Sequence, residues 1–148
     1  MKHIATCILA SLALAASAFA HGGVELGPNG GRLVEFGDHN SLHAEFVLKD
    51  GNFVIGLYDE AAKKQVPITN QVLAITHKEA NKKLTPELKD GKWTVAKPEG
   101  SDFWLILQFK EDAKAKAKNG RLHYDEAICS KCKAQEWICK CEENEAKK

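Results

Sequence analysis

Four cysteines stand close together near the end of the sequence, in the stretch CSKCKAQEWICKC at residues 129–141. Two residues separate the first pair, and one residue separates the second pair. Four thiolates at such spacing can enclose Zn²⁺ tetrahedrally at about 2.3 Å. Soft sulfur ligands also suit Cu(I). The pattern therefore predicts a metal site with Zn²⁺ or Cu(I) as its cofactor, formed by Cys129, Cys132, Cys139 and Cys141.

Two other kinds of chemistry fit the same cysteines. In an oxidising compartment they can form two disulfides, for which a nested pairing of Cys132 with Cys139 and Cys129 with Cys141 is plausible. A bond between Cys139 and Cys141 would close a very small, strained ring. The third alternative is a redox centre, but catalytic C-x-x-C pairs usually begin a helix in a βαβ unit, which this sequence does not indicate.

Several histidines are candidate supplementary ligands. His39 and His43 can share an ion only if a turn at GDHNS folds them together, because a straight strand would hold them roughly 13 Å apart. His123 stands close to the cysteine segment in the sequence and can replace one thiolate in a mixed site. Each of these side chains is otherwise an ordinary strand or surface histidine.

The first residues predict export. MKHIATCILASLALAASAFA has a basic start at Lys2, a short apolar run and a cleavage signal at Ala18-Phe19-Ala20. The alternative, an uncleaved membrane anchor, is disfavoured because the run is too short to span a bilayer comfortably. Cys7 would leave with this signal peptide, and the mature chain would be periplasmic or secreted.

His21 would then be the mature N-terminus. An N-terminal amine together with its own imidazole can chelate Cu(II), and a second histidine would complete a copper brace of the kind that oxidative enzymes use. A catalytic brace must be held rigidly, whereas His21 is followed by two glycines. The sequence also has no Ser-His-Asp set, phosphate-binding glycine loop or H-E-x-x-H motif. We therefore predict a protein that is not an enzyme.

The balance of charges excludes other classes of partner. Without Lys2, the chain keeps 20 basic residues of its 21 against 20 acidic ones, so no net field attracts nucleic acid or an anionic membrane. The rest of the sequence contains no second apolar run that would predict insertion into a membrane after signal removal. The 148 residues less the 20 of the signal suit one domain with one core.

Alternating apolar and polar residues predict an all-β fold. In LHAEFVLK, Leu42, Ala44 and Phe46 are expected to face the core, while His43 and Glu45 are expected to face water. Asp50-Gly51 predicts a hairpin turn. We expect a small antiparallel β-sandwich, Ig-like or barrel-like. Its expected strands are 32–36, 42–49, 52–58, 71–77, 92–95, 103–109 and 121–124.

The predicted organisation has five parts. They are a signal peptide (1–20), a flexible leader (21–31), the β-sandwich (32–126), a Cys-rich segment (127–142) and a disordered tail (143–148). Trp93 and Trp104 lie in strand patterns and are expected in the core. Trp137 lies inside the Cys-rich segment and is expected to pack that segment onto the sandwich.

The stretch GPNGGRLVEFGDHNSLHAEFVLKDGNFVIGLYDEAAKKQVPI at 27–68 resembles a small β-domain near the N-terminus of periplasmic adaptor subunits of heavy-metal efflux pumps of the cobalt–zinc–cadmium and copper type. Small secreted proteins with such a domain carry endings similar to HYDEAICSKCKAQEWICKC at 123–141. The resemblance implies a β-sandwich-like domain and a link to metal homeostasis. The chain has no long helical hairpin and no room for lipoyl and barrel domains, so it is not expected to act as an adaptor by itself.

Two functions remain open at this point. The first is a periplasmic metal-binding accessory protein that buffers, senses or carries copper or zinc beside an efflux system. The second is a structural or interaction module, stapled by two disulfides, that docks on an efflux-pump adaptor without binding metal.

Overall fold

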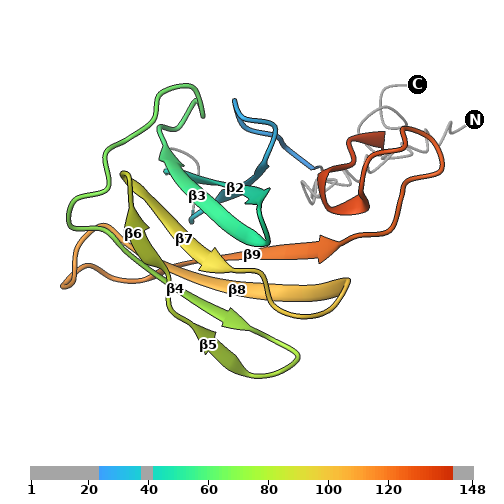
Figure 1. Cartoon of the computed structure of the whole chain (residues 1–148). Helices are drawn as coiled ribbons and strands as arrows, with labels where there is room; N and C mark the ends of the chain where they lie inside the picture. The colour runs from blue at the N-terminus through green and yellow to red at the C-terminus, as the bar shows by residue number, and fades with distance from the viewer. Residues whose placement is uncertain (1–23, 38–41, 142–148) are drawn as a thin grey trace, which may run out of the picture.

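The computed structural model (Figure 1) describes residues 24–37 and 42–141, and its strands form two antiparallel sheets that pack face to face. The all-β fold expected from the sequence is confirmed. The elements are β1 (Arg32–Glu35), β2 (His43–Lys49), β3 (Asn52–Tyr58), β4 (Val72–His77), β5 (Lys82–Leu84), β6 (Glu87–Lys89), β7 (Lys92–Ala96), β8 (Asp102–Lys110), β9 (Lys118–Asp125) and the 3₁₀-helix η1 (Glu136–Ile138).

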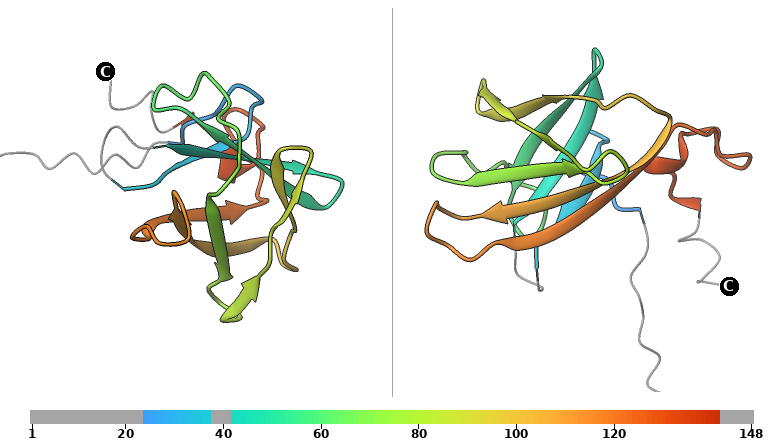
Figure 2. Two further views of the ribbon diagram at one scale, coloured as in Figure 1. Left: turned by 90° about the vertical axis from the view of Figure 1, so that its left-hand side faces the viewer. Right: turned by 90° about the horizontal axis from the view of Figure 1, so that it is seen from below.

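The two sheets exchange strands along the chain. One sheet has the order β1-β2-β3-β7-β6, and the other has the order β5-β4-β8-β9. The chain therefore crosses to the second sheet after β3, returns to the first between β5 and β6, and crosses again after β7. Figure 2 shows the two layers from two further sides. The signal-peptide prediction and the tail prediction concern residues outside the described part.

Two Asp-Gly turns set the register of their hairpins. Asp50 and Gly51 have φ angles of 49° and 74°, and Asp90 and Gly91 have φ angles of 52° and 73°. Positive φ at both central residues is the geometry of a type I′ turn, whose twist matches that of the flanking strands. The hairpin predicted at Asp50-Gly51 is confirmed, and it joins β2 to β3 in full register.

The core lies between the sheets and follows the alternation of the sequence. In β8 every second residue is buried, as are the alternate residues at the start of β3. Phe36, which follows β1, stacks on Phe109 of β8 with ring centroids 4.8 Å apart, so the two sheets also meet along this side. The largest fully buried side chains include Phe36, Phe46, Phe53, Phe103, Phe109 and Tyr124.

Some boundaries differ from those that the sequence predicts. β5 and β6 were not expected, because three-residue strands rich in Lys and Glu carry no apolar alternation. β9 starts at Lys118 rather than at residue 121, since Asn119 and Gly120 pair with β8 instead of making a turn. A side chain at Gly120 would meet Val34 at 2.8 Å, so the glycine permits this close packing.

The expectation for the outer face of β2 is wrong at two positions. His43 and Glu45, predicted to face water, are 8% and 1% exposed. The Nδ1 atom of His43 has no hydrogen-bond partner within the described part of the chain. Glu45 is covered by the turn at residues 27–31, which folds over the outer face of the sheet. Alternation in β2 alone could not reveal this cover, because the turn lies elsewhere in the sequence.

The covering turn satisfies the buried Glu45 carboxylate. The backbone N–H groups of Asn29 and Gly31 donate to its Oε1 at 2.7 and 3.0 Å. The side-chain amide of Asn29 donates to Oε2 at 2.7 Å and also to the Tyr58 hydroxyl at 2.6 Å. Burial, and then the Glu45 charge, raise the pKa of Tyr58. A buried carboxylate is tolerated here because several donors replace its hydration.

Two glycines allow the turn to approach so closely. A Cβ at Gly27 would lie 2.5 Å from Cδ of Glu45, and a Cβ at Gly31 would collide with the carbonyl oxygen of Phe46. These contacts give a physical reason for glycine at both positions. Residues 27–31, placed in a leader with a tight turn by the sequence, are thus hydrogen-bonded to the sandwich at Glu45.

We expect Glu45→Gln to lower the free energy of unfolding by roughly 1–3 kcal/mol. Glutamine keeps one acceptor oxygen but places an NH₂ group where donors already point, so at least one buried donor loses its partner. Urea unfolding followed by circular dichroism measures the change. Glu60→Gln, on an exposed loop, is the matched control and should stay within about 0.5 kcal/mol of the parent. Equal losses in the two variants would contradict a buried anchor at Glu45.

A second carboxylate, that of Glu126, holds the chain in place where it leaves the sandwich after β9. Glu126, just after β9, accepts a hydrogen bond from the Tyr124 hydroxyl at 2.7 Å and lies 3.2 Å from the Lys97 ammonium. Its backbone N–H donates to the carbonyl of Ser101 at 2.8 Å. The hydrogen bond from Tyr124, and then that from Lys97, lower the pKa of Glu126 below its ordinary value of 4.5.

The lowered pKa of Glu126 predicts that this residue contributes to the loss of folding stability at acid pH. Because the folded state favours the carboxylate, Glu126 stabilises the fold above its ordinary pKa, and that contribution is lost as the pH falls through the folded pKa. Glu126→Gln should therefore flatten the acid limb of a plot of unfolding midpoint against pH. The exposed Glu99→Gln serves as control. If Glu126→Gln left the acid limb as steep as in the parent, the assignment would be wrong.

Candidate metal centre

Trp137 fixes the Cys-rich segment to the end of the sandwich. Its side chain is 5% exposed, and its ring centroid lies 6.0 Å from that of Phe53 and 5.2 Å from that of Tyr124. The Arg32 guanidinium donates to the Trp137 carbonyl at 3.3 Å. The segment therefore lies beyond the end of β9, against the sandwich (Figure 1). The prediction that Trp137 packs the segment onto the sandwich is confirmed.

The first cysteine pair lies in a tight turn. The backbone N–H of Cys129 donates to Ala134 at 2.8 Å, and that of Lys133 donates back to the Cys129 carbonyl at 3.0 Å. Lys133 has a φ of 63°, which reverses the chain within a few residues. Cys129 and Cys132 consequently project toward the same point.

The second pair follows η1. The N–H of Cys139 donates to the Glu136 carbonyl at 3.1 Å and ends this single helical turn. The N–H of Cys141 donates to the Cys139 sulfur at 3.4 Å. Since Trp137 anchors the same turn in the core, the position of Cys139 and Cys141 depends on the sandwich.

The predicted convergence of the four cysteines is confirmed. All four Sγ atoms lie within 4.8 Å of one another, and they form the one group of at least three potential metal ligands among the described residues. Cys132 and Cys139 have Sγ atoms 3.5 Å apart, and Cys129 and Cys141 have theirs 3.7 Å apart. A tetrahedron with Zn–S bonds of about 2.3 Å has sulfur–sulfur edges of about 3.8 Å. No disulfide joins these sulfurs, whose spacing fits four-coordinate binding.

Backbone N–H groups favour negative charge on one sulfur. Hydrogen bonds from the N–H groups of Cys132 and then Lys131 lower the pKa of Cys129 to about 7. The N–H of Cys141 also favours the thiolate of Cys139, but the neighbouring Cys129 sulfur and burial oppose it, so the pKa of Cys139 is raised overall. The Cys132 side chain contributes most to a raised pKa of Cys141. Without a cation, Cys139 and Cys141 therefore resist ionisation beside the Cys129 sulfur.

The segment carries positive charge that suits a thiolate cage. Lys131, Lys133 and Lys140 contribute three positive charges between residues 129 and 141, against one negative charge from Glu136. Four thiolates around a divalent ion carry a net charge of −2, which this surplus of +2 balances. The interleaved lysines were readable in the sequence, although their electrostatic role was not part of the prediction.

The four cysteines of the candidate site, here called the cage, differ in their exposure to solvent. Cys129 and Cys139 are 5% and 6% exposed, whereas Cys132 is exposed and Cys141 is partly exposed. One side of the sulfur group therefore faces the protein and the other faces water. The buried side is held by the protein, and the accessible side is the one from which an ion would approach.

The two predicted histidine ligands that the structure describes, His43 and His123, do not join the sulfur group. His123 has Nε2 2.7 Å from Oδ1 of Asp102, and its ring stacks on Trp104 with centroids 4.5 Å apart. His43 is buried in β2 and belongs to no group of three ligands in the described part. His21 and His39 lie outside the described residues.

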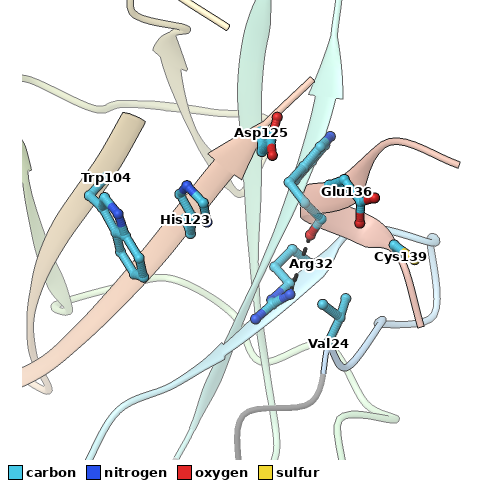
Figure 3. Close-up of a pocket in the computed structure, with 8 residues that line it drawn as sticks. Val24, Arg32, Trp104, His123, Asp125, Glu136 and Cys139 are labelled. Carbon is cyan, nitrogen blue, oxygen red and sulfur yellow. Dashed lines mark hydrogen bonds between the residues drawn. The ribbon is translucent and has the colours of Figure 1, made fainter. Parts of the chain in front are cut away.

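An open pocket of about 340 Å³ adjoins the cage (Figure 3). The residues around it include Val24, Arg32, Trp104, His123, Asp125, Glu136 and Cys139. The prediction that Trp104 lies in the core is wrong: it alternates with buried Phe103 and Leu105 and lies on the outer face of β8. Arg32, for which the sequence predicted no role in the site, links β1 to the cysteine segment.

The fold and the site define an all-β sandwich protein with a candidate four-cysteine metal centre. Comparisons add no relative to this description, since no family model, curated protein or solved structure matches the chain. Within the described residues, no helix is long and apolar enough to cross a bilayer.

We expect Trp137→Ala to lower the free energy of unfolding by about 3–5 kcal/mol, because it removes a buried ring from the core. The same change should make the buried thiols of Cys129 and Cys139 react faster with an alkylating reagent in the reduced protein. Unfolding curves and peptide-resolved alkylation measure both effects. Trp104→Ala is the control and should leave thiol reactivity unchanged; equal thiol reactivity in both variants would contradict the anchoring role of Trp137.

Proposed function

We propose that this chain is an exported metal-binding accessory protein that holds one thiophilic ion at Cys129, Cys132, Cys139 and Cys141. The observation that carries the proposal is the convergence of four Sγ atoms within 4.8 Å. The hydrogen bonds to the Cys129 sulfur and the lysines of the segment support it, since both favour an anionic cage.

Zn²⁺ fits this donor set best, with Cu(I) as the competing ion. Sulfur–sulfur distances of 3.5 and 3.7 Å are close to the edge of about 3.8 Å expected for tetrahedral Zn²⁺. Soft thiolates also bind Cu(I) tightly. A closed four-thiolate site leaves no open coordination position for a substrate, which favours binding or storage over catalysis.

The proposed role is buffering, sensing or carrying the ion beside a heavy-metal efflux system. The leader-like first twenty residues support a periplasmic or secreted location. The resemblance of residues 27–68 to an adaptor domain supports an efflux-pump adaptor as partner. The partly accessible cage supports exchange of the ion rather than permanent enclosure.

A disulfide-stapled interaction module is the second candidate. It is favoured by the same two sulfur contacts, Cys132 with Cys139 at 3.5 Å and Cys129 with Cys141 at 3.7 Å, which would have to shorten to an S–S bond length of about 2.0 Å. In this case the cysteines would hold the segment in place, and the sandwich would dock on a partner without an ion.

The deciding experiment uses protein purified from the exported fraction without reductant or chelator. We expect one zinc or copper ion per chain by elemental analysis, and four thiols that become titratable on denaturation with a chelator. After reduction, the metal-free chain should bind Zn²⁺ with micromolar or tighter affinity, measured against a chromophoric chelator. No bound ion and no affinity in the reduced state would refute the proposal, and absent thiols would favour the module.

Matched variants test which sulfurs bind. The double variant Cys132→Ser with Cys141→Ser removes two ligands from the accessible side and should weaken binding by at least about 100-fold, more than loss of an outer-shell partner does. Ser130→Ala, within the same turn, should bind like the parent. Equal affinities of the double variant and the parent would place the ion elsewhere.

A further inference from the structure

The four sulfurs divide into two pairs that each combine one buried and one accessible atom. Cys132 is exposed, and its Sγ lies 3.5 Å from that of buried Cys139. Cys141 is partly exposed, and its Sγ lies 3.7 Å from that of buried Cys129. An oxidant in solution can therefore reach one member of each pair, and the other member is in place to complete a disulfide.

The other pairings are less favourable. Joining Cys129 to Cys132 would leave Cys139 to bond with Cys141 across one residue, which strains the ring. Joining Cys129 to Cys139 would require oxidation between two sulfurs that are both sheltered from solvent. The nested pairing avoids both problems.

We propose that the metal centre is gated by oxidation: disulfides between Cys132 and Cys139 and between Cys129 and Cys141 replace the cage and expel its ion. This inference rests on the proposed function, because it concerns release from the same site. The oxidant is a disulfide of the oxidising compartment, either a small molecule or a thiol oxidase. The two alternatives for the segment, cage and staple, then become two states of one site.

The chemistry proceeds by thiol–disulfide exchange. The Cys132 thiolate attacks one sulfur of a disulfide R–S–S–R, forming a mixed disulfide and releasing R–S⁻. The Cys139 thiolate then attacks the Cys132 sulfur, which forms the protein disulfide and releases a second R–S⁻. Two cysteine thiolates have given up two electrons, and the reagent has taken them up as two thiolates. Cys141 and Cys129 repeat the exchange with a second reagent molecule.

Loss of the ion follows from charge. Each disulfide converts two anionic ligands into two neutral sulfurs, so the first exchange removes half of the ligand charge and the second removes the rest. A neutral disulfide sulfur is a far weaker ligand than a thiolate. The surplus positive charge of Lys131, Lys133 and Lys140 then repels a cation that the thiolates had attracted.

The sequence makes this pairing directly measurable. Tryptic cleavage places the four cysteines in four different peptides, 122–131, 132–133, 134–140 and 141–147. The full chain is first loaded with Zn²⁺ and its ion content is measured. It is then treated with oxidised glutathione under nitrogen, free thiols are alkylated in acid, and released zinc is followed with a chromophoric chelator.

We expect 132–133 linked to 134–140 and 122–131 linked to 141–147, with one zinc released per chain as these links form. Linkage of 122–131 to 134–140 would overturn the pairing. Disulfides that form without zinc release, or zinc release without protein disulfides, would overturn the gating. Failure to load zinc before any oxidant is added would instead refute the proposed function, and the gating with it.

A variant tests the contribution of the accessible Cys132 sulfur separately from that of the other three cysteines. In the reduced, metal-free chain, Cys132→Ser should slow formation of the first disulfide by at least about tenfold, because only the less accessible Cys141 thiol then remains to attack the oxidant. Ser130→Ala should react like the parent. Circular dichroism checks that each variant keeps its strands. An unchanged rate in folded Cys132→Ser would contradict the proposed route of entry.

Discussion

The cysteine segment holds its position through the burial of one indole ring. Trp137 packs against Phe53 and Tyr124, which come from different sheets, so the ring closes the end of the core and holds η1 there. Cys139 directly follows η1. The turn that contains Cys129 is joined to the start of η1, because the N–H of Glu136 donates to the carbonyl of Ala127. A metal cage on a free tail would need the ion to order every residue. Here the hydrophobic contact of Trp137 supplies part of that order without an ion.

A buried carboxylate supports the same region from the other side. Glu45 holds the turn at 27–31, and that turn leads directly into Arg32, whose guanidinium donates to the Trp137 carbonyl. The N-terminal turn and the C-terminal segment are therefore linked through β1. The buried Glu45 carboxylate and the Cys129 sulfur each accept hydrogen bonds from backbone N–H groups, which favour negative charge where water is excluded.

Much of the fold follows from local patterns. The alternation of apolar residues located the long strands, and Asp50-Gly51 located a hairpin, because both signals act over a few residues. The short strands β5 and β6 carry no such signal, since their pairing depends on neighbours in β4 and β7. The burial of Glu45 was also out of reach, because it depends on the turn at 27–31, which lies outside β2. Trp104 was misplaced because its strand, β8, buries only one of its faces.

The sequence by itself determined that the four cysteines fall within thirteen consecutive residues and that the chain would form strands. An extended segment of that length could still span roughly 40 Å, so the spacing permits convergence of the thiols without requiring it. The tertiary structure decided the rest of the site. It placed all four sulfurs within 4.8 Å, sheltered Cys129 and Cys139 while leaving Cys132 accessible, and kept His123 beside Asp102 and Trp104 instead of the sulfurs. The physical reason is that spacing limits only how far apart groups can be, whereas orientation and exposure depend on what the sandwich packs against them.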